Sequence, residues 1–177
     1  NQERIDAIVA EYRAQQAAQQ EAAGGGGGSY SGGEGGGIPM GGGGYMWPLP
    51  APYLQDHISS YYGNRDTGGD DRVTSWHSGT DIWAAGGTPI YAVYNGVVVD
   101  NFWLASSGNC LLISLDNGYY MEVHHMASPS HLAAGTPVSQ GDVIGYVGST
   151  GYNSTGNHLH FMLMDKGMKT FDPLSVY

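Results

Sequence analysis

The sequence has little that could cross-link the chain, bind nucleic acid or cross a membrane. Its one cysteine, Cys110, permits no internal disulfide and no cysteine-based zinc site. Six Lys and Arg stand against sixteen Asp and Glu, and a net charge of −10 argues against nucleic acid as a partner. No run of 18 apolar residues occurs, so no transmembrane segment is predicted. The chain starts at Asn1 without a signal-type apolar region, and we interpret it as a fragment or a processed form.

Glycine is abundant but unevenly distributed. Of the 30 glycines among 177 residues, fourteen lie within 24–44, and this tract has no Gly-X-Y period, which excludes collagen. A segment with so few side chains to bury is expected to be a flexible linker. A phosphate-binding loop would need a strand before the glycines and a helix after them, and neither is predicted here. We therefore divide the chain into a helical segment (1–23), a glycine-rich linker (24–44) and a globular domain (45–177).

The first segment is rich in Ala, Gln and Glu, which favour helix. Ile5, Ile8, Val9 and Tyr12 follow helical spacing, after which the apolar stripe dissolves into Ala and Gln. Two interpretations stay open. The helix could be the end of a coiled coil that self-associates through residues 1–23, or a surface helix that docks on the domain.

The globular domain has the pattern of an antiparallel β protein. Short apolar runs alternate with glycine-containing turns, and Asp116-Asn117-Gly118 is a strong hairpin turn. No stretch of ten residues after residue 50 has helical periodicity. The expected strands are 89–99, 110–115, 119–126, 143–147 and 158–164. We therefore predict an all-β domain preceded by an N-terminal helix.

Two short patterns could supply metal ligands. In His77-Ser-Gly-Thr-Asp81 the imidazole and the carboxylate lie on one side of an extended chain, and Gly79 permits close backbone approach. In a strand, His158 and His160 share one face. Buried imidazoles need a partner, which a metal or a hydrogen-bonded carboxylate can supply. The alternatives are a surface loop for the first pattern and a pair of core histidines for the second.

The other four histidines are less informative. Because adjacent strand residues face opposite sides, at most one of His124 and His125 is expected to point into the same site. His57 and His131 lie in polar segments and are expected to be solvated.

In this order and spacing, the motifs resemble the lysostaphin/LytM-like zinc metallopeptidases of bacterial cell walls, over residues 61–173. The segment 77–81 resembles the family's His-x-Gly-x-Asp motif, 123–126 its Tyr-x-His-Leu motif, and 158–160 its final His-x-His motif. Two positions depart from the family pattern, Val123 in place of Tyr and Asn157 in place of a common Pro. The resemblance implies an antiparallel β-sheet catalytic domain of the duplicated-hybrid-motif type.

The resemblance also implies roles for individual residues. His77, Asp81 and His160 would bind Zn²⁺ and leave one position open for water. His125 and His158 would be catalytic, one as general base and the other as a donor to the oxyanion or the leaving amine, in either order. The candidate substrate-binding residues are Arg65, Asn109, Ser154 and Thr155.

The implied function is a zinc-dependent endopeptidase that acts on cross-bridge or stem peptides of peptidoglycan, outside the cell or in the bacterial envelope. One alternative is a catalytically silent relative that binds and activates another wall hydrolase. Another is a carrier module, because 138–145 resembles a biotinyl-domain hairpin, although Lys166 and Lys169 stand in no suitable turn. Since some relatives cut pentaglycine, the tract 24–44 could also enter the groove as an inhibitor or a self-cleavage substrate.

Overall fold

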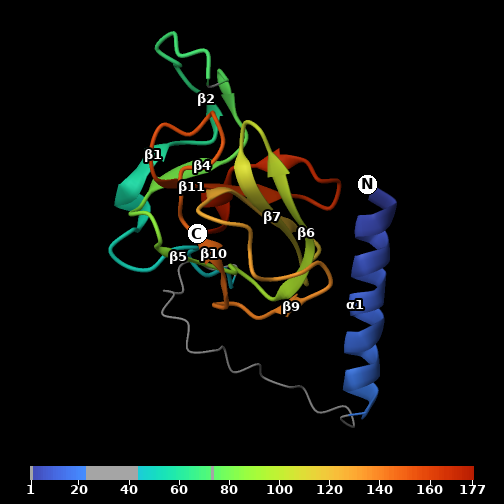
Figure 1. The fold of residues 1–177 in the computed structure, drawn as a ribbon. Helices are drawn as coiled ribbons and strands as arrows, with labels where there is room; N and C mark the ends of the chain where they lie inside the picture. Colours follow the sequence, from blue (N-terminus) through green and yellow to red (C-terminus); the bar gives the residue numbers. More distant parts are fainter. Residues whose placement is uncertain (1, 23–43, 73) are drawn as a thin grey trace.

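The chain folds around one large antiparallel sheet. The structure, a computed structural model, describes residues 2–22, 44–72 and 74–177. Figure 1 shows how this sheet is placed in the domain. It has eight strands, of which β12 (Thr170–Phe171) pairs with β11 beside the main path. The order of that path is β1 (Ile58–Ser60), β4 (Thr80–Trp83), β11 (His158–Met164), β8 (Tyr120–Met126), β7 (Gly108–Leu115), β6 (Gly96–Leu104) and β9 (Pro137–Val138). The predicted antiparallel β fold is confirmed.

Smaller elements complete the domain. Two-stranded ribbons are formed by β5 (Pro89–Tyr91) with β10 (Val143–Tyr146), and by β2 (Gly63–Asn64) with β3 (Trp76–His77). Short 3₁₀ helices span Gln55–His57 (η1) and Pro173–Val176 (η2). The predicted turn at 116–118 joins β7 to β8, with Gly118 at φ +88°. The single strand predicted over 89–99 was wrong, because the backbone of Ala92 pairs with Gly141 and Asp142 and separates β5 from β6.

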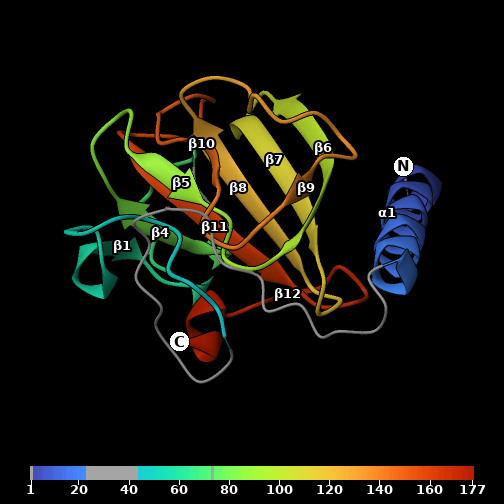
Figure 2. The same cartoon turned by 90° about the horizontal axis from the view of Figure 1, so that it is seen from below.

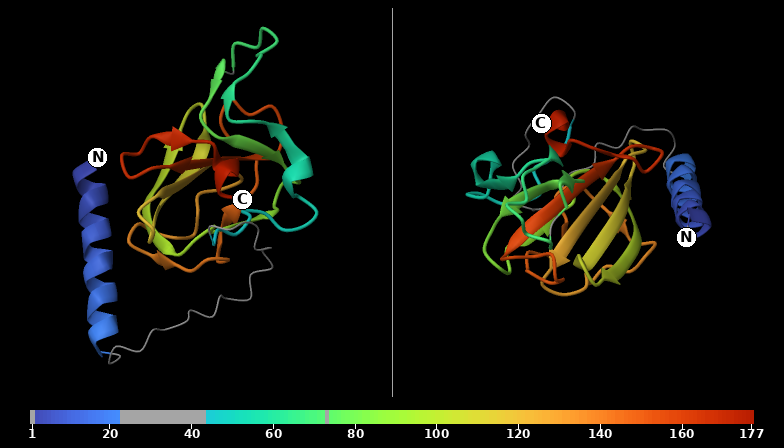
Figure 3. Two further views of the ribbon diagram at one scale, coloured as in Figure 1. Left: turned by 180° about the vertical axis from the view of Figure 1, so that it is seen from behind. Right: turned by 90° about the horizontal axis from the view of Figure 1, so that it is seen from above.

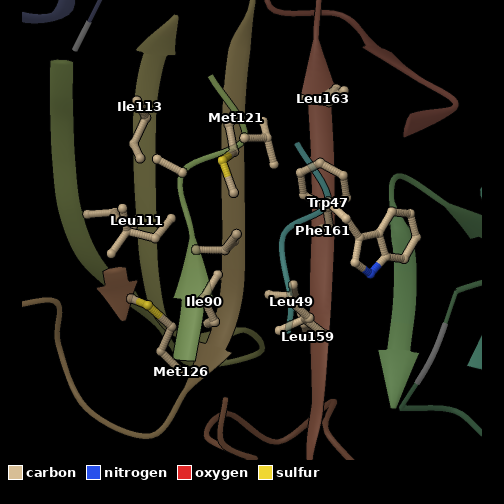
Figure 4. Close-up of a cluster of buried hydrophobic side chains, with 14 of the residues drawn as sticks. Trp47, Leu49, Ile90, Leu111, Ile113, Met121, Met126, Leu159, Phe161 and Leu163 are labelled. Atoms are coloured by element: carbon tan, nitrogen blue, oxygen red, sulfur yellow. The ribbon is translucent and has the colours of Figure 1, made fainter. Parts of the chain in front are cut away.

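The inner face of the sheet carries the main core. The β5–β10 ribbon crosses this face (Figure 2), and the segment with Trp47 and Leu49 packs beside it. Strand alternation explains the composition of the face, because every second residue of β7, β8 and β11 points inward. The close-up in Figure 4 shows these side chains, among them Leu111, Ile113, Met121, Leu159, Phe161 and Leu163, each at most 1% exposed.

The outer face of the sheet carries a second apolar cluster, which the helix α1 (Gln2–Ala22) covers. Ile5, Val9 and Tyr12 are at most 7% exposed, and Arg4 forms an ion pair of 2.6 Å with Asp100 on β6. The sheet contributes Val97, Val99, Leu112, Tyr120 and Met164 to the cluster. Figure 3 shows α1 beside β6, at the opposite side of the domain from β2.

Of the two interpretations of the first segment, the docked helix is confirmed. The stripe that could have formed a coiled coil is buried against the domain itself. Although α1 has 21 residues, no helix in the described part of the chain is apolar enough to cross a membrane. The predicted linker 24–44 lies outside the described residues, apart from Gly44.

Candidate active site

A polar cleft of about 570 Å³ opens where β3, β4, β11 and β8 meet. The side chains of β4, β11 and β8 that point into it alternate with residues of the main core. On β11, His158 and His160 face the cleft, while Leu159 and Phe161 are fully buried on the other side, as strand alternation predicted. The cleft therefore lies on the outer face of the sheet, the face that α1 covers further along the strands.

Three side chains converge at the floor of this cleft. Nε2 of His77 lies 3.1 Å from Oδ1 of Asp81 and 3.0 Å from Nδ1 of His160, and the last two atoms are 2.7 Å apart. His160 and Asp81 are cross-strand partners on β11 and β4. Among the described residues, this trio is a group of His and Asp side chains able to hold one metal ion.

The chemistry of this donor set fits a metal cation. Nδ1 of His77 donates to the carbonyl of Tyr61 at 2.8 Å, so in the neutral ring Nε2 carries a lone pair. That lone pair faces a carboxylate oxygen and a second imidazole nitrogen. These three atoms share too few protons for each of them to be hydrogen-bonded to the other two. Burial lowers the pKa of His160 to about 4, which keeps the ring neutral, the form that binds a metal. Two imidazole nitrogens and one carboxylate form a set that zinc accepts.

Asp81 is held as a carboxylate. Burial alone would raise its pKa, but the contacts with the His160 and His77 rings outweigh burial and hold the pKa well below the usual range. Arg65 lies 3.6 Å from Oδ2 of Asp81 and is itself fixed by bonds to the Thr74 carbonyl and to Ser60. Arg65, a predicted substrate-binding residue, lines the cleft and also orients Asp81.

Gly79 makes the close approach of β3–β4 to β11 possible. A Cβ atom at this position would lie 2.5 Å from the Phe161 carbonyl oxygen and 2.7 Å from Cγ of Met162. Any side chain would push the turn that carries His77 and Asp81 away from His160. The role that the sequence predicted for this glycine is confirmed.

His125 and His158 flank the trio. Their rings are 4.7 Å apart, and Nε2 of His158 lies 3.7 Å from Oδ1 of Asp81. In both residues Nδ1 donates to a backbone carbonyl, from His125 to Thr150 at 2.7 Å and from His158 to Gly156 at 2.8 Å. Burial lowers the pKa of His125 to about 4, although the bond to Thr150 opposes the shift. Both rings therefore present an Nε2 lone pair to the cleft.

The expectation that His124 and His125 point to opposite sides was wrong, because both line the cleft. His125 has φ of +60°, a left-handed conformation rare outside glycine, and the β7–β8 register shifts next to it. Regular alternation ends there, and the chain turns the second imidazole toward the first. His124 stacks on His160, with ring centroids 4.9 Å apart and an interplanar angle of 25°.

Of the other predicted site residues, some line the cleft and others lie behind its wall. Thr155 lines the cleft, as Arg65 does, whereas Asn109 and Ser154 lie outside its lining. The Asn109 side chain donates to the Met126 carbonyl, and its backbone N–H donates to the Thr150 hydroxyl, so Asn109 supports the segment that carries His125. Ser154 bonds to the Gly156 carbonyl beside His158. Both residues support the segments that carry His125 and His158.

Sequence reasoning did not identify several residues of the cleft. Trp76 and Trp83 line it and are 51% and 53% exposed. Trp83 follows Asp81 on the same face of β4, so strand alternation from Asp81 could have placed it there. Glu122 bonds to His124 at 2.6 Å, and the same alternation along β8 would have paired these two residues. The ring of His57, expected to be solvated, stacks on Trp83.

Comparison with known proteins agrees with this geometry. The model of peptidase family M23 matches residues 75–173, so the chain belongs to this family. It is 34% identical over 144 residues to the L-Ala–D-Glu endopeptidase of Bacillus subtilis, a match that covers 74% of this chain and 42% of the relative. It is 37% identical over 92 residues to the peptidoglycan DD-endopeptidase ShyC of Vibrio cholerae, covering 52% of this chain and 21% of the relative. The chain spans less than half the length of these relatives.

The fold agrees with solved structures of the same kind. The catalytic domain of lysostaphin from Staphylococcus simulans aligns with a TM-score of 0.61 at 29% identity. The alignment covers 72% of this chain and 96% of that domain. The resemblance to lysostaphin-like peptidases is thereby confirmed.

Proposed function

We propose that the chain is a zinc-dependent endopeptidase that hydrolyses peptide bonds of peptidoglycan in the bacterial envelope or outside the cell. The observation that carries the proposal is the convergence of His77, Asp81 and His160, whose ligand atoms lie within 3.1 Å of one another. Nε2 of His77 and Nδ1 of His160, with a carboxylate oxygen of Asp81, would hold the ion. When bound, zinc acidifies a water molecule and polarises the scissile carbonyl.

The protein's own residues would handle the protons. With Nδ1 bonded to a backbone carbonyl, His125 and His158 each offer Nε2 as a proton acceptor toward the cleft. The one that accepts the proton becomes an imidazolium and returns the proton from the same atom to the leaving amine. The neighbouring ring, 4.7 Å away, stays neutral beside it, because two adjacent imidazolium ions would repel each other. Either histidine can take this role, because each has Nδ1 bonded to a backbone carbonyl and Nε2 directed toward the cleft.

The lining of the cleft favours substrate residues that carry no charge. Arg65 and Asp81 are the charged side chains among its lining residues other than histidine, and they face each other. Serine, threonine and asparagine side chains and two half-exposed tryptophans make up most of the remaining wall. Peptide groups of small residues can bond to such a wall without leaving a buried charge unpaired.

The test combines metal analysis with wall digestion. Purified protein is expected to hold one zinc ion and to release peptides with new amino termini from isolated peptidoglycan, as detected by mass spectrometry. Removal of zinc by a chelator should stop the release, and added zinc should restore it. Digestion that yields no new amino termini would overturn the proposal.

A non-catalytic activator of another hydrolase is the alternative function. Against it, all five positions implied by the resemblance carry side chains able to act, and the structure brings them together in one cleft. The same digestion separates the two functions. An activator would release peptides only when a second hydrolase is present, whereas the proposed enzyme acts alone.

A further inference from the structure

His160 differs from the other histidines of the site in how its ring is held. In His77, His125 and His158, Nδ1 donates to a backbone carbonyl, which fixes both the tautomer and the ring plane. His160 instead directs Nδ1 at Asp81 and His77. Among the described residues, no hydrogen bond holds its other nitrogen, Nε2. A histidine that binds a metal usually has that second nitrogen bonded, and the bond orients the ring.

A stacked ring, that of His124, takes the place of this missing bond. The His160 ring is close to two others, with centroid distances of 4.9 Å to His77 and 4.9 Å to His124. The His124 contact is the more parallel, at 25° against 48° for His77. Because His124 and His160 are direct cross-strand partners on β8 and β11, their side chains leave the sheet side by side.

The His124 ring is itself fixed by a carboxylate. Nε2 of His124 lies 2.6 Å from Oε1 of Glu122, two residues earlier on the same face of β8, and both side chains are nearly buried. A carboxylate in this position needs a hydrogen-bonding partner, since an unpaired buried charge is costly. The Glu122–His124 pair therefore holds the His124 ring in one orientation, with its face against the His160 ring.

We propose that Glu122 and His124 are positioning residues for the metal ligand His160: the carboxylate fixes the His124 ring, and the stacked ring holds His160 with Nδ1 toward His77 and Asp81. This inference rests on the proposed role of His160 as a ligand. Neither residue is assigned a contact with substrate. The pair does for His160 what backbone carbonyls do for the other three rings.

The first measurement is zinc affinity of the full chain, by competition with a chelator. His124→Ala removes the stacked ring and should weaken zinc binding about 10-fold or more, the usual effect of losing such a support. Glu122→Ala leaves the ring but frees it, and should cause a smaller loss. Glu122→Gln keeps an oxygen that accepts from His124, and should bind zinc nearly as the wild type does. His131→Ala, which removes an exposed histidine, is the matched control.

The second measurement needs no metal and shows whether a variant has lost the fold. In the metal-free protein, NMR signals of the His160 ring should report one ring environment in the wild type and in Glu122→Gln. In His124→Ala the same signals should broaden or double, while those of the main core stay unchanged. A folded His124→Ala variant with a single, unaltered His160 ring and wild-type zinc affinity would overturn the inference. A wild-type chain that binds no zinc would instead contradict the proposed function, and the ring signals would still decide on the positioning role.

Discussion

The same strands form both ends of the sheet's outer face, but one end carries polar side chains and the other carries apolar ones. On β8, His124 lies in the cleft and Tyr120 lies under α1, and on β11 the corresponding residues are His160 and Met164. At the cleft end, polar side chains are held by hydrogen bonds and stay open to substrate. At the α1 end, apolar side chains are closed off by a helix.

This difference shows how one strand can serve two purposes. Four residues of a strand span roughly 13 Å, so the side chains change character within the same backbone and the same face. The chemistry of the cleft depends on how the histidine rings are oriented and on what their lone pairs bind. The stability of the α1 end depends on buried apolar area. Changes at the first end should therefore affect chemistry with little effect on stability, and changes at the second should do the reverse.

The largest expected effect is at the cleft end, on replacing a proposed metal ligand. His160→Ala removes one of three donor atoms, and we expect zinc binding and peptide release to fall below detection while the far-UV circular dichroism spectrum is retained. Zinc content and mass spectrometry of digested walls measure the two losses. His131→Ala should behave as the wild type does. A His160→Ala protein with one bound zinc would show that the trio is not the metal site.

The reciprocal change is at the α1 end. Ile5→Ala removes a side chain that is 4% exposed, and the free energy of unfolding should fall by about 2 kcal/mol, the low end for such truncations. The activity of the folded fraction should stay the same, because α1 does not line the cleft. Chemical denaturation and a peptidase assay measure the two quantities. Gln19→Ala, at an exposed position of the same helix, is the control, and equal stability of Ile5→Ala and the wild type would show that α1 does not pack on the sheet in solution.

The sequence predicts best those features of the fold and the site that neighbouring residues determine. Alternation along β11 placed His158 and His160 on one face, and the Asp-Asn-Gly turn fixed the β7–β8 hairpin, because both depend on neighbouring residues. The pairing of His77 with His160 followed from the family resemblance rather than from spacing, since 83 residues separate them.

The features that the sequence alone did not determine have long-range causes. The left-handed backbone of His125 directs the side chains of two adjacent histidines into the same cleft. This conformation depends on how β7 and β8 pair. Asn109 has the polarity of a substrate contact, but tertiary structure directs its amide at the Met126 carbonyl. Docking of α1 was one of two open interpretations, because a stripe of apolar residues does not identify the surface that covers it.

Alkaline pH should test the apolar interior of the domain rather than the proposed metal ligands. Burial raises the pKa of Cys110 to about 12, and it raises the pKa of Tyr177 well above its usual 10. Both groups are neutral when protonated, so their contribution to stability is complete below the unfolded-state pKa values, near 9 and 10. It is lost as the pH rises toward the folded-state values, by about 1.4 kcal/mol per pH unit for each group.

Denaturation between pH 8 and pH 11 measures this loss. Tyr177→Phe removes the bond from the Tyr177 hydroxyl to the Met46 carbonyl, which costs about 1 kcal/mol at neutral pH, but it should flatten the decline above pH 10. Cys110→Ala should flatten the decline between pH 9 and pH 10. A decline that is equally steep in both variants and the wild type would assign alkaline unfolding to other groups.

The smallest expected effect distinguishes two tryptophans of similar exposure, 53% for Trp83 and 58% for Trp103. Trp83 lines the cleft and is stacked by His57, whereas Trp103, 58% exposed, lies on β6 outside the lining. Trp83→Ala should raise the KM for a soluble peptide substrate roughly fivefold, close to 1 kcal/mol, and leave kcat nearly unchanged. Trp103→Ala should change neither constant. Both variants lose a ring of the same type and of similar exposure. An equal rise in KM would therefore mean that the substrate-binding surface extends beyond the residues that line the cleft. The boundary between the two ends of the outer face would then have to be moved.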